Sequence, residues 1–295
     1  IVSKLYNCFD GGNTMFWSEA EEAYVLYYRY SDTKRSVART TSKDFLNWSE
    51  HVPMTYGDTP REHIYTNNTI PYFRAPHTYI ALAARYMQGR RVLTDEQGES
   101  IGFNTPELLK YWAKSCSDGV LMSTRPGSTE YDRTFMEGFV HPGPGYGNWT
   151  SRTNYPLTGI YPFGKNQMMF WVNRNYMQDT WHIEQQVLRL DGFVSVNAGY
   201  SGGEMVTKPF VFSGKELEIN YRTSAVGSIW IEIQTADGVP IDGYRLEECA
   251  EIIGDETARR VRWSGSSDLA GLSTQPIRLR FKLKDADLYA LCFVD

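Results

Sequence analysis

Residues 13–55 alternate short hydrophobic runs with polar turns, and this pattern predicts four β-strands. Two of the runs, AYVLYYRY and RSVARTTS, are rich in the aromatic and β-branched residues that favour strands. Ser31, Asp32 and Thr33 lie between these two runs and are suited to a turn. Four strands within about 45 residues match the repeat of one β-propeller blade. The predicted strands are Thr14–Ser18, Ala23–Tyr30, Arg35–Ser42 and His51–Thr55.

The stretch Arg61–His77, with the sequence REHIYTNNTIPYFRAPH, organises the pattern that follows. Its aromatic and β-branched residues give it strand character. It nevertheless carries more charged and amide groups than a dry core strand can bury without partners. We therefore expect Ile64–Phe73 to be an inner strand that lines a wet cavity.

A second and a third blade-like unit follow, each with a polar loop, a polar inner strand, an apolar second strand and a charged third strand. Residues 92–115 interrupt the second unit with helical character, because Pro106 suits a helix start and Glu107 its first turn. The predicted strands are Ile64–Phe73, Thr78–Met87, Gly119–Thr124 and Phe135–Val140, then Thr153–Pro162, Gln167–Asn173, Trp181–Leu190 and Phe193–Ala198.

The character of the chain changes at Gly202-Gly203, after which short strands alternate with polar turns. In Ser228–Gln234 three isoleucines alternate with Trp230, Glu232 and Gln234, which predicts one buried and one wet face. The fold class is therefore all-β, with a β-propeller portion at residues 1–203 and a C-terminal β-sandwich at residues 204–295. The predicted sandwich strands are Phe210–Phe212, Glu216–Tyr221, Ser228–Gln234, Arg259–Trp263, Ile277–Leu283 and Leu288–Phe293.

Composition narrows the function classes. The formal charge is −5 with no Lys/Arg cluster, so no nucleic-acid partner is implied. No apolar run approaches the ~20 residues of a membrane span. The 20 Tyr and 8 Trp suit pleated surfaces, and they also suit stacking on sugars. The N-terminal residues lack a signal-peptide pattern, so the chain is expected to be secreted or periplasmic if such a peptide was removed, and otherwise cytoplasmic.

No cofactor and no metal site is expected. The four cysteines (Cys8, Cys116, Cys249 and Cys292) are far apart and form no C-x-x-C pair, which favours isolated buried thiols. The chain also lacks G-x-S-x-G, P-loop, H-E-x-x-H and G-x-G-x-x-G motifs.

Candidate catalytic acids are expected where inner strands begin, because a propeller pocket forms where those strands converge. Asp10 precedes two glycines, which allow close backbone approach to a ligand but also favour an Asx turn. Glu62 and His63 can share proton transfer or form a surface pair. Asp118 can be an acid or a turn residue. Glu137 suits a general acid if it is buried, although strand alternation would place it toward solvent.

Hydrolysis of a glycosidic bond without a cofactor needs two carboxyl groups, and these four acids supply enough. An oligo- or polysaccharide is thus the expected partner. The substrate-binding candidates are polar and aromatic residues near the same strand starts. They are Asn13, His63, Asn67, Arg74, His77, Trp149, Arg152 and Asn154.

Several segments resemble a group of bacterial glycoside hydrolases of the five-bladed β-propeller type, akin to the fructosidase/arabinanase superfamily. The resemblance covers nearly the whole chain and is not specific for a substrate. The segments are FDGGN (9–13), EHIYTN (62–67), YFRAPH (72–77), SDGVLMS (117–123), NWTSRTNYP (148–156) and DADLY (285–289).

This resemblance implies three acids: a base or nucleophile matched by Asp10, an orienting acid matched by Asp118 or Glu62, and a proton donor matched by Glu137. The chain departs from the superfamily because it lacks the Asn-Asp-Pro-Asn-Gly box and shows three blade-like units instead of five. We therefore expect a fragment without its N-terminal blades, or a barrel completed by association with missing blades or by self-assembly.

Two alternatives remain open from the sequence. One is a non-catalytic glycan-binding or structural protein that keeps the fold. The other is a sialidase-like hydrolase, in which Arg61, Arg74 and Arg152 clamp a carboxylate and a tyrosine is the nucleophile. The absence of a Ser-x-Asp-x-Gly-x-x-Trp box weighs against the second alternative.

Overall fold

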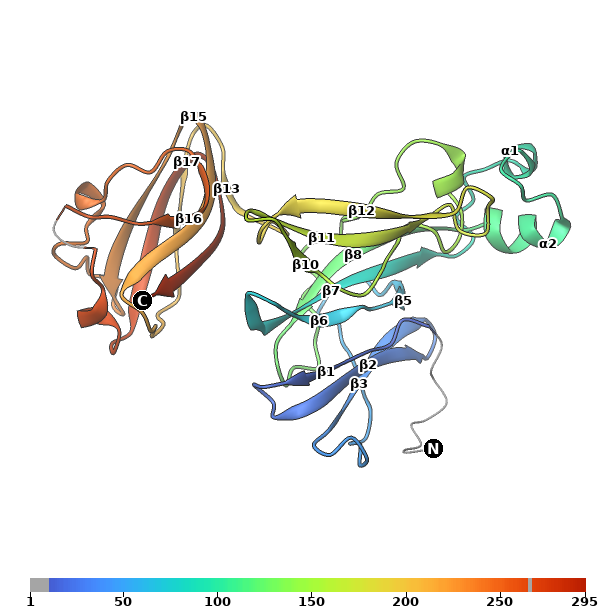
Figure 1. Ribbon diagram of the computed structural model, residues 1–295, viewed down its shortest axis with the longest axis horizontal. Coiled ribbons are helices and arrows are strands. Elements are labelled where there is room, and N and C mark those ends of the chain that lie inside the picture. Colours follow the sequence, from blue (N-terminus) through green and yellow to red (C-terminus); the bar gives the residue numbers. More distant parts are fainter. Residues whose placement is uncertain (1–10, 265–266) are drawn as a thin grey trace. The chain divides into compact units, whose positions relative to one another are not determined.

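The computed structural model describes residues 11–264 and 267–295, and it is all-β, as the sequence predicted (Figure 1). It has two compact units. One contains the chain up to Phe163 together with Met169–Val187, and the other contains Gly164–Met168 and Leu188–Asp295. The second unit thus begins before the predicted boundary at residue 203, because strands ahead of it pair within this unit. No helix in the described ranges has the length and apolar character required to cross a membrane.

The first sheet is a four-stranded antiparallel meander in chain order, as predicted for one blade. Its last strand is only two residues long, shorter than predicted, because only Val52 and Pro53 pair with the third strand. The strands are β1 (Thr14–Ser18), β2 (Ala23–Ser31), β3 (Arg35–Ser42) and β4 (Val52–Pro53).

The second sheet has a divided inner strand. Both β5 and β6 pair with the same edge of β7, and β8 pairs with its other edge. The predicted outer strand Phe135–Val140 is wrong, since only Val140 forms an isolated bridge, to Gly119. The carbonyl of Met136 accepts a side-chain hydrogen bond instead of joining a ladder. The strands are β5 (His63–Thr66), β6 (Thr69–Tyr72), β7 (Ala75–Met87) and β8 (Cys116–Thr124).

The predicted helical insertion is confirmed between β7 and β8. Helix α1 (Asp95–Ser100) begins with a capping box, in which Thr94 and Gln97 satisfy each other's backbone N–H groups. Helix α2 (Pro106–Leu108) is capped by Thr105 and continues as one π-helical turn, η1 (Leu109–Ala113).

The third sheet repeats the divided inner strand, with β9 and β10 both pairing with β11. The predicted Phe193–Ala198 strand is reduced to β13 (Val196–Ala198), which pairs with β17 of the second unit. A 3-10 turn, η2 (Tyr146–Asn148), precedes the sheet. Its strands are β9 (Tyr155–Pro156), β10 (Tyr161–Phe163), β11 (Gln167–Arg174) and β12 (His182–Arg189).

A buried cluster joins the first and second sheets. It contains residues of β2, β3, β5, β7 and β8, with Tyr27, Tyr79 and Tyr131 among its largest fully buried side chains. Tyr79 donates to Ser18 Oγ at 2.6 Å, and Tyr131 shares a 2.6 Å bond with Thr69. These bonds let the polar ends of tyrosine lie inside a core that is otherwise apolar.

The second unit is organised around one long antiparallel ladder between β15 (Glu216–Thr235) and β17 (Ile277–Val294). The predicted pairs of shorter strands are continuous here, because a bulge between Thr223 and Ser228 absorbs the irregular segment without ending the strand. Both halves of the ladder bury side chains in one core. β13, β14 (Gly203–Val206) and β16 (Asp255–Arg260) complete the sheet, and two 3-10 turns, η3 (Leu246–Glu248) and η4 (Ala270–Leu272), connect its parts.

The predicted alternation in Ser228–Gln234 is confirmed for Ile229, Ile231 and Ile233, which are fully buried. The prediction that Glu232 and Gln234 face water is wrong, since they are 3% and 8% exposed. Their burial is compensated because Gln234 donates to Glu232 at 2.7 Å and Arg280 pairs with the same carboxylate.

Gly119 supplies a test of packing around β8. A Cβ added there would lie 2.8 Å from Val140 Cβ and 2.9 Å from Pro156 Cγ. We expect Gly119→Ala to lower the free energy of unfolding by about 1–3 kcal/mol in urea denaturation, as overpacking does. Gly11→Ala is the control, because nothing lies within 4 Å of the added atom. Equal stability of the two variants would contradict this packing.

Candidate functional site

Antiparallel pairing brings several predicted acids to one end of the second sheet. In the β7–β8 ladder Arg85 lies opposite Asp118, and in the β5–β7 ladder it lies opposite Ile64. Glu62 directly precedes β5 at this same end. The local strand pairing therefore places one cation between two acids that are far apart in the sequence.

The Arg85 network consists of Glu62, Arg85, Asp118 and Arg133. Arg85 Nε and Nη2 donate to the two carboxylate oxygens of Asp118 at 2.8 and 2.5 Å. Its Nη1 donates to Glu62 Oε1 at 2.9 Å, and Arg133 donates to Glu62 Oε2 at 2.6 Å. All four carboxylate oxygens thus accept a charged donor, the strongest class of protein hydrogen bond.

The electrostatics of the two arginines differ. The hydrogen bond with Asp118 raises the pKa of Arg85, against the effect of burial. Burial lowers the pKa of Arg133, and the charge of Glu62 opposes that effect. The Arg133 side chain is 2% exposed, and its Nη1 has no hydrogen-bond partner among the described residues.

Glu137 approaches the same network from a third segment. The carbonyl of its neighbour Met136 accepts from Arg85 Nη1 at 2.9 Å. A Cβ added at Gly138 would lie 3.0 Å from Asp118 Oδ2. The Glu137 side chain itself is exposed, so the alternative reading of the sequence, in which it faces solvent, is the correct one. The structure therefore gathers Glu62, Asp118 and the Met136 carbonyl, which precedes Glu137, around one guanidinium.

A second group, the Tyr65 cluster, is formed by Arg29, Arg35, Tyr65, Tyr86 and Arg152. The Arg29, Arg35 and Arg152 guanidinium carbons lie 4.0, 5.2 and 5.7 Å from the Tyr65 ring centroid. Arg29 also donates to the Tyr65 carbonyl at 2.8 Å. These residues come from the end of β2, the start of β3, β5, the end of β7 and the segment before β9.

The Tyr65 side chain can contact these arginines because Tyr65 lies at an irregularity in the pairing of β5. Arg85 and Ala84 are consecutive on β7, and they pair with Ile64 and Thr66. Tyr65 is therefore the extra residue of a β-bulge, a device that redirects a side chain out of the regular alternation.

Two predicted binding residues keep accessible positions near these groups. Asn13 is exposed, and its Oδ1 accepts from the Arg29 backbone N–H at 3.3 Å. His63 Nδ1 accepts from the Arg35 N–H at 3.2 Å. Asp10 lies outside the described residues.

Asn67 and Asn154 are structural, contrary to their predicted role in binding substrate. Asn67 is 1% exposed, and its amide contacts Thr14, Gly12 and Thr69. Asn154 is fully buried, and its amide donates to two backbone carbonyls while accepting from Arg174. Their amide groups satisfy local backbone and are occupied.

Arg74 and His77 do not join the Arg85 network. They lie at the start of β7, whereas Arg85 lies near its end, a distance of roughly 30 Å along an extended strand. Of the other arginines in the sialidase-like alternative, Arg61 pairs with Asp32 at 3.0 Å and Arg152 lies beside the Tyr65 ring. Trp149 is half-buried, and its indole N–H donates to the Gly143 carbonyl at 2.9 Å.

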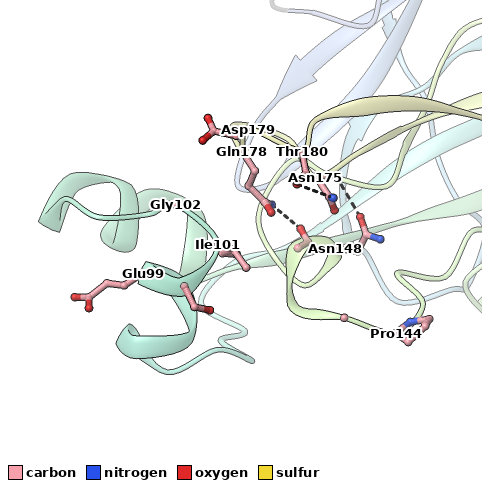
Figure 2. A pocket seen from close by; sticks show the side chains of 12 residues that line it. Glu99, Ile101, Gly102, Pro144, Asn148, Asn175, Gln178, Asp179 and Thr180 are labelled. Atoms are coloured by element: carbon pink, nitrogen blue, oxygen red, sulfur yellow. Dashed lines mark hydrogen bonds between the residues drawn. The ribbon is translucent and has the colours of Figure 1, made fainter.

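This unit also contains two cavities. The larger, of about 580 Å³, lies between the helical insertion and the loops of the third sheet (Figure 2). Its polar lining includes Glu99, Asn148, Asn175, Gln178, Asp179 and Thr180. Gln178 donates to the Gly147 carbonyl at 2.7 Å, and Asn175 donates to Thr180 at 3.0 Å. The smaller, of about 430 Å³, is lined by Arg133 and by residues around the end of β8.

Sequence analysis predicted Arg152 as a binding residue but missed the other four arginines of the two groups. Arg29, Arg35 and Arg85 lie within strands predicted as framework, and Arg133 lies in a loop. A usable signal was present, since a charged residue within an apolar strand such as TYIALAARYM needs a partner.

No protein-family model matches this chain, and no curated protein does. Among solved structures, an N-acetylgalactosamine deacetylase from F. plautii in complex with blood group B trisaccharide gives a TM-score of 0.42 at 10% identity. That match covers 61% of this chain and 50% of the deacetylase, so the chain spans half of that protein's length.

Two fructofuranosidases match more of the chain at lower scores. A Bombyx mori GH32 beta-fructofuranosidase with sucrose gives a TM-score of 0.35 at 8% identity, covering 90% of this chain and 88% of that one. A Schwanniomyces occidentalis fructofuranosidase with fructosylnystose gives 0.30 at 8% identity, covering 97% and 95%. Similarities of this size do not assign the chain to a family.

Removing Arg85 tests whether its network holds the sheet together. We expect Arg85→Met to lower the free energy of unfolding by about 3 kcal/mol, because two partly buried carboxylates lose their shared cation. Arg91→Met is the control, since Arg91 pairs with Asp95 on the surface and such pairs contribute at most about 1 kcal/mol. Urea denaturation measures both variants, and equal losses would contradict a special role for Arg85.

His63 supplies a test by pH. Burial and the positive charges of Arg35 and Lys34 lower its pKa. The unfolded chain therefore takes up this proton at higher pH than the folded chain. The stability contribution of neutral His63 is complete above its unfolded pKa of about 6.5 and is lost as the pH falls below it.

We expect His63→Gln to reduce the loss of stability of the protein between pH 7.5 and pH 5, as measured by urea denaturation at each pH. An unchanged pH dependence in the variant would show that His63 does not contribute.

Proposed function

We propose that this chain is a carbohydrate-active hydrolase that cleaves a glycosidic bond at the Arg85 network. The observation that carries this proposal is the gathering of Glu62, Asp118 and the Glu137 segment, from three parts of the sequence, around one arginine. Hydrolysis of a glycoside requires paired carboxyl groups, and this is a place where the fold brings several together.

The proposed roles follow from exposure and pairing. Both carboxylate oxygens of Asp118 and of Glu62 accept hydrogen bonds from arginine. This environment favours the ionised form, so the proposed role of both residues is that of an anion. Glu137 is exposed and has no ion pair among the described residues, so its carboxyl group is accessible to a substrate. As the general acid of this proposal it must be desolvated by the bound sugar in order to hold the proton that it gives to the glycosidic oxygen. As the anomeric C–O bond breaks, water or a carboxylate forms the new bond to the anomeric carbon. When water attacks, its proton passes to a carboxylate.

The Tyr65 cluster is a separate aromatic surface that suits a sugar. Tyr65 and Tyr86 have ring centroids 5.9 Å apart, and Tyr155 lies 5.3 Å from Tyr65. Aromatic faces with polar edges suit sugars, which present both C–H surfaces and hydroxyl groups. Oligo- and polysaccharides are therefore the proposed substrate class.

A non-catalytic glycan-binding protein is the second candidate. It is favoured by the full occupation of the Glu62 and Asp118 oxygens, because a catalytic carboxylate must release a donor before it can act on a substrate. In that case the network would be structural only, and sugars would bind without turnover.

Hydrolysis of a glycan library by matched variants separates the two candidates. We expect Asp118→Asn and Glu137→Gln each to lower kcat by about 100-fold or more, since general acid–base groups contribute roughly that much. Glu21→Gln is the matched control, because Glu21 is also a partly buried carboxylate that pairs with an arginine, Arg39 at 2.6 Å. Glu21 lies at the β1–β2 turn, and its loss should leave kcat unchanged in the folded protein.

Binding of a glycan with no turnover by the wild-type protein would support the second candidate. Equal turnover by wild type, Asp118→Asn and Glu137→Gln would remove these acids from the proposed reaction. Circular dichroism on each variant confirms that it is folded before kcat is compared.

A further inference from the structure

The Tyr65 cluster concentrates positive charge at one place on the molecule. Three guanidinium groups lie within 5.7 Å of one ring centroid. Arg29 is 7% exposed and bonds to the Tyr65 and Gly11 carbonyls. Arg35 is half-buried, and Arg152 is exposed. The three guanidinium groups therefore differ in exposure, from buried Arg29 to exposed Arg152.

Arg35 and Arg152 lack a carboxylate partner among the described residues, in contrast to Arg39 and Arg174 of the same unit. Arg39 pairs with Glu21 and Arg174 with Glu184, each at 2.6 Å. Like charges held close together repel one another, and an anion at this place would relieve that repulsion.

Both of these arginines are fixed by aromatic rings. Arg35 lies 5.2 Å from the Tyr65 centroid and 5.1 Å from the Tyr86 centroid. Arg152 lies 4.3 Å from the Trp112 ring and 5.7 Å from Tyr65. Contact with a ring engages the face of a guanidinium and leaves its in-plane N–H groups available to an oxyanion. The two side chains are thus pre-organised for an external acceptor.

A buried hydroxyl adds an independent sign of a ligand. Tyr155 is 9% exposed and packs against Tyr65 at 5.3 Å, and its hydroxyl has no hydrogen-bond partner among the described residues. Buried polar groups are normally satisfied, so this hydroxyl, like that of Tyr27, keeps an unused bond that a nearby acceptor would satisfy.

The backbone also holds Arg152 in an unusual conformation. Its φ is +64°, in the left-handed region that a non-glycine residue seldom adopts. Asn173 donates to the Arg152 carbonyl at 3.1 Å and helps to keep this geometry. Strain of this kind tends to occur at ligand sites.

We propose that Arg35 and Arg152, beside Tyr65 and Tyr155, bind an oxyanion attached to a sugar, so that the chain acts on acidic glycans. The proposal rests on the proposed function only in taking the ligand to be a glycan. A uronate carboxylate and a sulfate ester share the chemistry that two arginine edges recognise. The acidic group would be bound by the Tyr65 cluster, beside the aromatic faces available to its ring.

Calorimetric titration of the whole chain tests this proposal. The probes are an oligogalacturonate, a sulfated neutral oligosaccharide, an uncharged oligosaccharide of the same length, and sodium sulfate alone. We expect at least one acidic probe to bind about tenfold tighter than the uncharged one, since a charge-assisted bond contributes that much. The acidic probe that binds identifies the carboxylate or the sulfate as the ligand.

The variants are Arg35→Gln, Arg152→Gln and, as control, Arg125→Gln. Arg125 is also an exposed arginine, and it donates to the His77 carbonyl at 3.2 Å. We expect each of the first two changes to weaken acidic binding by about tenfold and to leave uncharged binding unaffected. The control should change neither. Arg152→Lys keeps the charge and should recover part of the loss.

The proposal is overturned if acidic and uncharged probes bind equally, if the control loses as much affinity as the cluster variants, or if sodium sulfate binds as tightly as the sulfated sugar. Turnover separates this result from the proposed function. Arginine-dependent binding without hydrolysis leaves the acidic subsite standing and removes the hydrolase. Hydrolysis with no preference for acidic sugars does the reverse.

Discussion

The sharing of Arg85 between Asp118 and Glu62 is the constraint on which this end of the molecule depends. Asp118 is the residue opposite Arg85 in the ladder, and Glu62 reaches it from the chain segment that follows the first sheet. One guanidinium therefore connects backbone pairing inside a sheet with the path of the chain between two sheets. Since the side chains are only partly exposed, removing one group leaves a partly buried charge without its partner.

The same pairing limits what the acids can do. A carboxylate whose two oxygens both accept hydrogen bonds from arginine is held in a fixed orientation. It has little capacity left to bond to a substrate. Glu137 has the opposite character, because it follows the Met136 carbonyl that joins the network while its own side chain is exposed. The proposed chemistry would therefore combine two paired carboxylates with one exposed carboxyl group.

The sequence predicted the order and type of most strands, because aromatic and β-branched runs are separated by clear turns in residues 13–55 and around β7. It also predicted the helix at Pro106 from its start signals. It could not predict that Phe135–Val140 forms no strand, since the decisive contact is a carbonyl bonded to a distant arginine. The continuity of β15 was missed for a similar reason, because its bulge depends on the partner strand.

Individual site residues were harder to predict than strands. Asn67 and Asn154 have the composition of binding residues, but their amide groups are used up by nearby backbone, which only coordinates reveal. Arg74 and His77 are close to Glu62 in sequence yet lie at the other end of β7. The arginines of the Tyr65 cluster come from two strands and the segment before β9, so no local spacing could have connected them.

The divided inner strand of the second sheet has a wider consequence. Tyr65 has no partner in the pairing of β5 with β7. The following strand, β6, pairs with β7 again, with Thr69 opposite Ala81. The direction of the Tyr65 side chain is therefore independent of the strand register that packs the core. Such a chain can exchange the groups that face its ligand without repacking its interior, which leaves specificity free to diverge on an unchanged frame.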